Sequence, residues 1–321
     1  MEKQEVRFDQ IINCGCGIDV HKETVVATIR RSDTEFETRT FDTFTGSLIV
    51  LRDWAKAEGV THIAMESTGI YWKPVFNVLE EDFEIILVNA RHVRNVPGHK
   101  TDKKDSRWIS KLLLSGLLKG SFIPPQEIRE LRDLMRYKKK KVAQIASEKN
   151  RIIKILEDGN IKLSSVVSEV SGVSATKIIN DIIDGKTNID ELMKHLHKSI
   201  KTERTTIRKA LEGRITKHHR FMLNIVRESI QEQEKIIAKL DEQIDEAAHA
   251  YSVEVDLLQS IPGIGKDSAI TIISEIGVDM SRFPNEQHLS SWAGLSPGSN
   301  ESAGKKKVPE PPMETNSSKQ P

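Results

Sequence analysis

The chain has 321 residues, of which 37% are hydrophobic and 30% charged, and its net charge is +1. This length is enough for about two domains with buried cores. The first residues lack an apolar signal core, and no apolar run approaches the roughly 20 residues that a membrane span needs. Two cysteines, Cys14 and Cys16, are too few for a disulfide framework. The sequence therefore predicts a cytoplasmic protein with no membrane partner.

The small net charge conceals a strongly basic segment. Residues 91–154 contain 18 Lys and Arg against 6 Asp and Glu. Such an excess of positive charge favours a polyanionic partner, most simply a nucleic acid. The alternative is a basic helix face that only keeps the protein soluble.

Strand and helix patterns alternate through the first 90 residues. Three consecutive strands are expected at 16–20, 23–30 and 36–44, pairing as an antiparallel meander. A helix at 47–58, a strand at 62–65, a helix at 71–80 and a buried strand at 83–88 follow, and a further helix comes after them. This order predicts an α/β domain of the ribonuclease-H-like type.

Acidic residues occur where these strands end. Asp19 ends the first strand, Glu66 ends the fourth, and Asp102 and Asp105 open the helix after the fifth. If the first and fourth strands are neighbours, four carboxylates meet at one end of the sheet, where divalent cations would relieve their repulsion. Each acid alone could instead cap a turn or a helix. Basic residues surround the last two acids and could meet a phosphate: Lys100, Lys103, Lys104 and Arg107.

Long amphipathic helices are predicted after residue 123. The first runs from 126 to about 156 and carries four consecutive lysines, Lys138, Lys139, Lys140 and Lys141, which favour contact with a phosphate backbone. A solvated face is the alternative for this quartet. In residues 223–247, apolar residues recur in heptads, which predicts a coiled coil either within the chain or between subunits.

A glycine-rich turn follows this coil. Gly263 and Gly265 lie between two short helices, the second beginning near Lys266, in the pattern of a helix-hairpin-helix that brings backbone N–H groups to a phosphate. A simple tight connection between helices is the alternative. A further helix is expected at 283–292, and then comes a loop that holds Ser302 and three lysines.

Several motifs in order resemble those of the DEDD transposases of bacterial insertion sequences, also described as bridge-RNA-guided recombinases. They are residues 17–22 (GIDVHK), 66–71 (ESTGIY), 100–105 (KTDKKD), 261–265 (IPGIG) and 293–297 (AGLSP). The resemblance implies a RuvC-like catalytic domain at 11–122, a helical and coiled-coil region at 123–250, and a small, mainly helical transposase domain at 251–307. The last residues, 308–321, are expected to form a disordered tail.

The resemblance also implies a chemistry. Asp19, Glu66, Asp102 and Asp105 would bind Mg²⁺ or Mn²⁺, and Ser302 stands where the family has a nucleophilic serine that forms a covalent phosphoserine with DNA. The implied partners are the insertion-sequence ends and target DNA, a structured guide RNA and further copies of the chain in a dimer or tetramer.

The C-terminus departs from the family pattern. Related chains continue after the serine loop with a basic turn and a long helix, whereas residues 308–321 are short, polar and proline-rich. We therefore expect a truncated C-terminal domain and an inactive transposase. Two rival interpretations are a RuvC-like structure-specific endonuclease that uses water as its nucleophile and a remnant that binds nucleic acid without cutting it.

Overall fold

The structure is a computed structural model. It describes residues 10–67, 69–89, 106–118, 120–167, 169–197 and 202–295, together with the backbone of 301–302 and 305–306. The chain divides into two compact units, one formed by residues up to Ile123 and from Asn285 onward, the other by residues 124–284. We call them the sheet unit and the helical unit. The expected third domain at 251–307 thus contributes to both units, and the predicted domain boundaries remain a prediction.

The sheet unit is built on a five-stranded sheet in the order β3-β2-β1-β4-β5. The first three strands are antiparallel neighbours, whereas β1, β4 and β5 run parallel. Their bounds are Gly15–Val20 (β1), Thr24–Arg30 (β2), Phe36–Asp42 (β3), His62–Glu66 (β4) and Glu84–Val88 (β5). The predicted strand order and the adjacency of β1 and β4 are confirmed.

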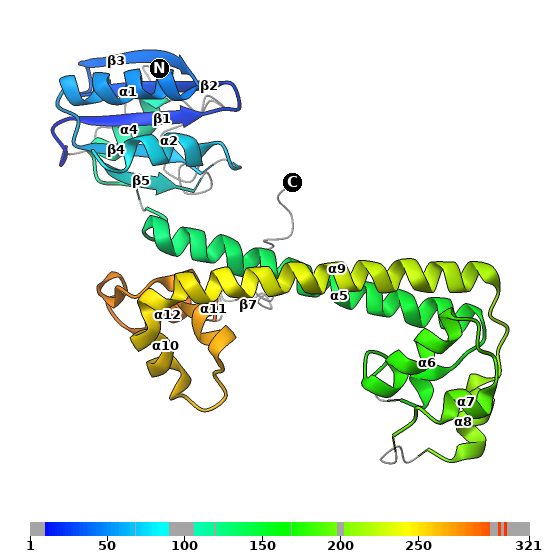
Figure 1. The fold of residues 1–321 in the computed structure, drawn as a ribbon. Helices are drawn as coiled ribbons and strands as arrows, with labels where there is room; N and C mark the ends of the chain where they lie inside the picture. Colours follow the sequence, from blue (N-terminus) through cyan, green and yellow to red (C-terminus); the bar gives the residue numbers. More distant parts are fainter. Residues whose placement is uncertain are drawn as a thin grey trace. The chain divides into compact units, whose positions relative to one another are not determined.

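Helices cover both faces of this sheet (Figure 1). One face carries α1 (Thr45–Ala57) and α2 (Trp72–Leu79), and the other carries α4 (Ser106–Leu114). Strand β1 shows why the faces differ, because Cys16 and Ile18 point into the apolar core under α1 and α2 while Gly17 and Asp19 point to the α4 side. The fold is the mixed α/β domain that the sequence predicted for a RuvC-like protein.

The sheet unit also contains residues from the far end of the sequence. Helix α12 spans Glu286–Trp292, and two short strands, β6 (Glu301–Ser302) and β7 (Lys305–Lys306), pair antiparallel. The prediction placed the start of α12 three residues earlier, at 283. The helix begins later because Asn285 is its N-cap: the Asn285 side chain accepts a hydrogen bond from the backbone N–H of His288.

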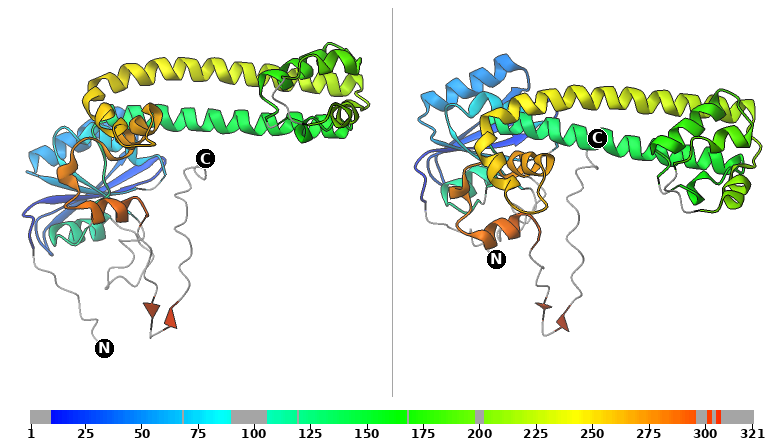
Figure 2. Two further views of the ribbon diagram at one scale, coloured as in Figure 1. Left: turned by 90° about the horizontal axis from the view of Figure 1, so that it is seen from below. Right: turned by 60° about the horizontal axis from the view of Figure 1, so that its bottom comes forward.

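Two long helices form the frame of the helical unit. Helix α5 (Gln126–Asp158) and helix α9 (Lys217–Ala248) run side by side for most of their length, as the views of Figure 2 show. Of the heptad series, Leu223 and Ile244 are buried near the two ends of α9. Between Val226 and Ile244, all of which the structure describes, no α9 residue is fully buried. The two long helices therefore pack firmly at their ends and only partly in between.

Each end of this pair carries its own small core. At one end the core gathers around Ile178, Leu211 and Leu223, with α6 (Val173–Ile183), α7 (Ile189–Met193), α8 (Arg204–Leu211) and the short helix η1 (Leu163–Ser165). At the other end the core gathers around Leu131, Ile244 and Ile270. It includes α10 (Ser252–Gln259) and α11 (Lys266–Ile276), flanked by the short helices η2 (His249–Tyr251) and η3 (Met280–Arg282).

Arginines of α5 hold the end of α11 within this second core. The Arg132 side chain donates hydrogen bonds to the carbonyl oxygens of Ser274 and Glu275, both at 2.9 Å. Arg136 donates two hydrogen bonds to the Glu275 carboxylate, at 2.8 and 2.9 Å. Burial lowers the pKa of Arg132, yet an arginine stays charged at neutral pH. The last carbonyls of α11 therefore receive cationic donors, as helix C-termini favour.

Candidate functional site

Asp19 lies near the end of β1 on the side of the sheet that α4 covers. Its side chain is nearly buried, with 9% of the residue exposed. His21 lies two residues further on, and its Nε2 is 3.2 Å from the Asp19 Oδ2 atom. Alternation along the strand explains this orientation, since Ile18 and Val20 point to the opposite, apolar face.

Glu66 ends β4, the parallel neighbour of β1. The strand register pairs Gly17 with Ala64 and Ile18 with Met65, and Asp19 and Glu66 are the next residues of the two strands. Glu66 is 2% exposed. Neighbouring strands lie about 4.8 Å apart, a separation that one cation can bridge between two carboxylates. The two predicted acids thus stand side by side at the carboxyl edge of the parallel strands.

The N-terminus of α4 packs against the same part of the sheet. A Cβ atom added to Gly17 would lie 2.3 Å from both the Ser106 carbonyl oxygen and the Ser110 backbone nitrogen. Only glycine therefore allows the helix backbone to approach β1 so closely. Ser106, the first residue of α4, lies over Gly17. On this face of β1, the next residue after Gly17 is Asp19.

Hydroxyl groups join α4 to the sheet at this point. Thr28 Oγ1 and Ser106 Oγ share a hydrogen bond of 2.7 Å, and both residues are 0% exposed. Thr28 Oγ1 also shares a hydrogen bond of 2.9 Å with Thr38 Oγ1. One turn further along α4, Ser110 Oγ accepts a hydrogen bond of 3.1 Å from Arg30 Nε. The first turn of α4 is therefore fixed by directional contacts as well as by packing.

The other half of the predicted acidic set, Asp102 and Asp105, lies outside the described residues. The predicted phosphate contacts Lys100, Lys103 and Lys104 also lie outside them. Asp105 directly precedes Ser106 in the sequence. Within the described ranges, no three or more His, Cys, Asp or Glu side chains are grouped to hold a metal ion.

The sequence matches two family models of transposases. The first, a DEDD transposase of the IS110 type, matches residues 16–161, and the second, the transposase IS116/IS110/IS902 family, matches residues 255–314. The chain belongs to the IS110-type DEDD transposases. No curated protein matches it. Membership of this family makes the chain a DNA-binding, DNA-processing enzyme of an insertion sequence.

No described helix is long and apolar enough to cross a membrane.

The lysine quartet of this transposase lies on α5, and its members differ. Lys138 is mostly buried and forms ion pairs with Asp241 at 2.6 Å and with Asp267 at 2.8 Å. Burial alone would lower the pKa of Lys138, but these two carboxylates outweigh it and the pKa is raised. Lys139 and Lys140 are exposed, and the Lys141 ammonium lies 5.0 Å from the centre of the Tyr137 ring. The lysines of this quartet that can meet a phosphate are therefore the last three.

Arg107 is an exposed residue of the first turn of α4. Its Nε donates a hydrogen bond of 3.3 Å to Thr38 Oγ1, and its guanidinium lies 5.3 Å from the centre of the Phe36 ring. This predicted nucleic-acid contact therefore stands beside the hydroxyl groups that join α4 to β2 and β3.

The predicted glycine turn joins α10 to α11 in the helical unit. Gly263 has φ +93°, a value that favours glycine, and a Cβ atom at either Gly263 or Gly265 would meet nothing within 4 Å. Gly265 is the N-cap of α11 and has no side chain to cap it. Lys266 pairs with Asp245 at 2.7 Å. The turn thus leaves open space next to a helix N-terminus, while its lysine is engaged with a carboxylate of α9.

Ser302 lies on β6, opposite Lys305 on β7. The two strands make a short hairpin, and only its backbone is described. The predicted disordered tail at 308–321 lies outside the described residues. The role of Ser302 therefore stays a prediction.

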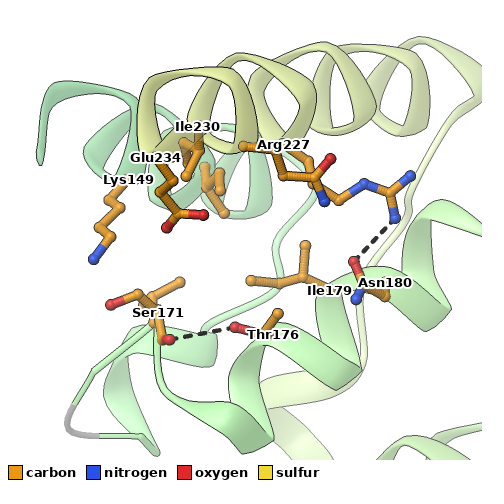
Figure 3. Close-up of a pocket in the computed structure, with 11 residues that line it drawn as sticks. Lys149, Ser171, Thr176, Ile179, Asn180, Arg227, Ile230 and Glu234 are labelled. Atoms are coloured by element: carbon orange, nitrogen blue, oxygen red, sulfur yellow. Dashed lines mark hydrogen bonds between the residues drawn. The ribbon is translucent and has the colours of Figure 1, made fainter. Parts of the chain in front are cut away.

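A cavity of about 210 Å³ lies in the helical unit between α5, α6 and α9 (Figure 3). Ile152, Ile179 and Ile230 are among its apolar lining residues. Its polar side chains include Arg227, whose Nη1 donates a hydrogen bond of 3.0 Å to Asn180 Oδ1. None of the catalytic, metal-binding or nucleic-acid-binding residues predicted from the sequence lines this cavity, so it is distinct from the acidic pair of the sheet unit.

Sequence reasoning missed the residues that hold α4 on the sheet. They are Gly17, Thr28, Arg30, Ser106 and Ser110. Two signals were available: alternate glycines at 15 and 17 leave one face of a strand without side chains, and serines at 106 and 110 share one face of a helix. Neither signal identifies its partner, because that partner is distant in the sequence.

Proposed function

We propose that this transposase cleaves and rejoins DNA strands at a metal site formed by Asp19, Glu66, Asp102 and Asp105, with Ser302 as its nucleophile. The observation that supports the metal site is the pair of buried carboxylates, Asp19 and Glu66, on neighbouring parallel strands. They face the side of the sheet where α4 begins, and α4 begins directly after Asp105.

The donor set fits a hard divalent cation, Mg²⁺ or Mn²⁺. Carboxylate oxygens are the ligands that such ions prefer, and two buried carboxylates on adjacent strands repel each other unless a positive charge lies between them. When bound, the metal would stabilise charge on the scissile phosphodiester and make a nearby hydroxyl more acidic. The roles of the four acids are to hold the ion and fix the phosphate beside it.

Ser302 would supply the hydroxyl. In the proposed step its Oγ bonds to phosphorus, the phosphorus bond to one deoxyribose oxygen breaks, and the serine proton leaves with a base while the departing oxygen gains one. The product is a phosphoserine that a second DNA hydroxyl can displace in the reverse sense. This cycle conserves the number of phosphodiester bonds, as recombination requires.

Positive charge would hold the nucleic acid along both units. Lys100, Lys103, Lys104 and Arg107 would contact phosphates at the acidic site. In the helical unit, Lys139 to Lys141 and the N–H groups of the Gly263–Gly265 turn would contact the backbone of a duplex. A guide RNA would choose the DNA by base pairing, and a homodimer or homotetramer would bring together the parts of one site.

A strand-exchange assay tests the proposal. It would use the full chain, the DNA ends of the element, the RNA transcribed beside it and Mg²⁺, and it would detect both recombined DNA and covalent protein–DNA adducts. Wild type should give both products, and Ser302→Ala should lose both. A wild type that gives neither recombined DNA nor an adduct would refute the proposal.

The same assay separates the rival functions. An endonuclease that uses water would still cut DNA after Ser302→Ala and would never form an adduct. A binding remnant would retain DNA affinity but show no cleavage, and Asp102→Asn would change neither property. Cleavage that disappears in Asp102→Asn and an adduct that disappears in Ser302→Ala would support the proposed recombinase.

A further inference from the structure

The helical unit carries a second concentration of positive charge, separate from the lysine quartet. Residues 204–221 span α8, the loop after it and the first turn of α9, and they contain six Lys and Arg against one Glu. They lie at the end of the helical unit that also holds α6 and α7 (Figure 1). The proposed metal site and duplex contacts use none of these residues. Such an excess of one sign in a DNA-binding protein favours a further contact with a polyanion.

Three of these cations are free to meet an external anion. The acidic side chains beside the segment pair with other groups: Glu157 with Lys162, Asp158 with His219 and Asp190 with Arg208. No described carboxylate forms an ion pair with Lys209, Arg214 or Lys217. All three residues are exposed. Binding a phosphate at these positions therefore breaks no ion pair within the protein.

The loop between α8 and α9 is held against the end of α5. The backbone N–H of Arg214 donates a hydrogen bond of 2.7 Å to the Gly159 carbonyl oxygen, and that of Lys162 donates one of 2.8 Å to Ala210. A Cβ atom added to Gly213 would lie 2.5 Å from the Gly159 carbonyl oxygen, so the two backbones are in direct contact. The backbone that carries the cations is thus fixed before a ligand binds, which lowers the entropy cost of binding.

An exposed aromatic ring lies one helical turn from these cations. Phe221 is 62% exposed, and Lys217 precedes it by four residues on the same face of α9. The opposite face of α9 holds Leu223 and Val226, which are buried in the core of this end. A single exposed apolar residue is ordinary on a protein surface. A ring beside unpaired cations, however, has the composition of a site that binds single strands, where bases stack on aromatic side chains.

We propose that Lys209, Arg214, Lys217 and Phe221 form a surface that binds an unpaired segment of nucleic acid. We call it the α8–α9 surface. The three cations would contact phosphates of the strand, and one base would stack on the Phe221 ring. A duplex fits less well, because its bases are already stacked on one another and leave the ring without a partner. The α8–α9 surface contains none of the proposed catalytic residues, so the proposal goes beyond the metal site and does not depend on it.

The first test measures how binding depends on salt. The full chain is titrated into fluorescein-labelled oligouridine or oligothymidine, which are unstructured single strands, and fluorescence anisotropy is recorded at several salt concentrations. Each phosphate contact to a single strand contributes about 0.7 to the slope of log K against log salt, so the double variant Arg214→Gln/Lys217→Gln should reduce that slope by about 1.4. The matched control is Lys177→Gln/Lys194→Gln, which removes two other exposed lysines at the same end of the unit and should leave the slope unchanged.

The second test removes the aromatic ring. Phe221→Leu keeps an apolar side chain but offers no flat surface for a base. It should weaken binding of the single strand by about 5- to 100-fold, as the loss of one stacked base does. The salt slope should not change, and the affinity for a blunt duplex of the same length should stay at the wild-type value. The melting temperatures of all these variants should match that of wild type, because the substituted residues are exposed.

The outcomes decide the proposal. Binding of either strand with the expected losses supports it, and the strand that binds more tightly identifies RNA or DNA as the ligand. An unchanged salt slope in Arg214→Gln/Lys217→Gln would overturn it. Equal losses of single-strand and duplex affinity in Phe221→Leu, or no loss at all, would overturn it as well. Adduct formation in the strand-exchange assay depends on Asp102 and Ser302, so a failure of the recombinase proposal is distinguishable from a failure here.

Discussion

The two faces of the sheet are covered in different ways. Under α1 and α2 the contact is apolar, built from side chains such as Ile18, Leu51 and Leu79 that are fully buried. Under the first turn of α4 the sheet presents a glycine, Gly17, and the hydroxyl of Thr28. The backbone of the helix there packs directly on the backbone of β1. Apolar side chains of α4 contribute as well, because Ile109 and Leu113 pack with Ala64 of β4.

The difference separates stability from position. Apolar contacts have no direction, so they stabilise a fold without fixing its parts finely. Close backbone approach and hydrogen bonds fix a helix in register but contribute less free energy. Asp19 and Glu66, two of the proposed catalytic acids, lie on the second face. Changes there should therefore alter function, and changes on the first face should alter stability alone.

The largest expected effect comes from Gly17→Val. The first atom of any side chain at Gly17 would lie 2.3 Å from two backbone atoms of α4, which cannot move independently of the helix. We expect the free energy of unfolding to fall by more than about 4 kcal/mol, measured by urea denaturation. Gly46→Ala in α1 is the matched control, because a Cβ atom there meets nothing within 4 Å. A mild effect of Gly17→Val would mean that α4 does not sit closely on β1.

Leu51→Ala should give the next largest change. Leu51 belongs to α1 and is fully buried, and its truncation leaves a cavity that costs about 3 kcal/mol of unfolding free energy. The affinity for Mn²⁺ should stay at the wild-type value because α1 packs on the face of the sheet opposite to Asp19 and Glu66. A large loss of metal affinity in Leu51→Ala would break the contrast between the two faces.

Arg30→Met should have a smaller effect. The Arg30 guanidinium bonds Ser110 Oγ and the carbonyl oxygens of Ser32 and Asp33, at 3.0 to 3.1 Å. We expect a loss of about 2 kcal/mol in urea denaturation, since buried bonds to a charged donor are lost. Arg39→Met, at an exposed position on β3, should cost less than about 1 kcal/mol. Equal costs for both variants would argue against a polar attachment of α4.

The smallest effect concerns pH and a polar cluster in the helical unit. Bonds from Lys186 and then His195 hold the pKa of Asp181 below its usual range. A lowered folded pKa contributes stability above the unfolded pKa of about 3.9, and that stability is lost as the pH falls through the folded pKa. The melting temperatures of wild type and Asp181→Asn should therefore converge on acidification. The buried contact between Thr28 and Ser106 joins two hydroxyls and contains no carboxylate. The melting temperature of Thr28→Val should therefore differ from that of wild type by the same amount at neutral and at acidic pH.

The sheet and the acidic pair could be predicted from the sequence because the signals are local. Strand patterns gave the element order, and the parallel pairing of β1 and β4 then brings Asp19 and Glu66 together at one edge. The attachment of α4 could not be predicted, because Gly17 and Ser106 are distant in the sequence and a strand glycine has several explanations.

The lysine quartet shows the same limit. Four consecutive lysines predict a helix with charge on every side, but not which one turns inward. Lys138 is held by Asp241 and Asp267, which come from α9 and α11, more than a hundred residues later. Ion pairs between residues so far apart in the sequence follow from the packing of helices, which composition and periodicity do not specify.

We have proposed that Asp19 and Glu66 belong to one metal site with Asp102 and Asp105. Anomalous X-ray diffraction from crystals of the full chain grown with Mn²⁺ tests it most directly. We expect an anomalous peak within bonding distance of the Asp19 and Glu66 carboxylates, with Asp102 or Asp105 completing the coordination. Bound Mn²⁺ found elsewhere, with the four carboxylates on separate faces of the domain, would contradict it.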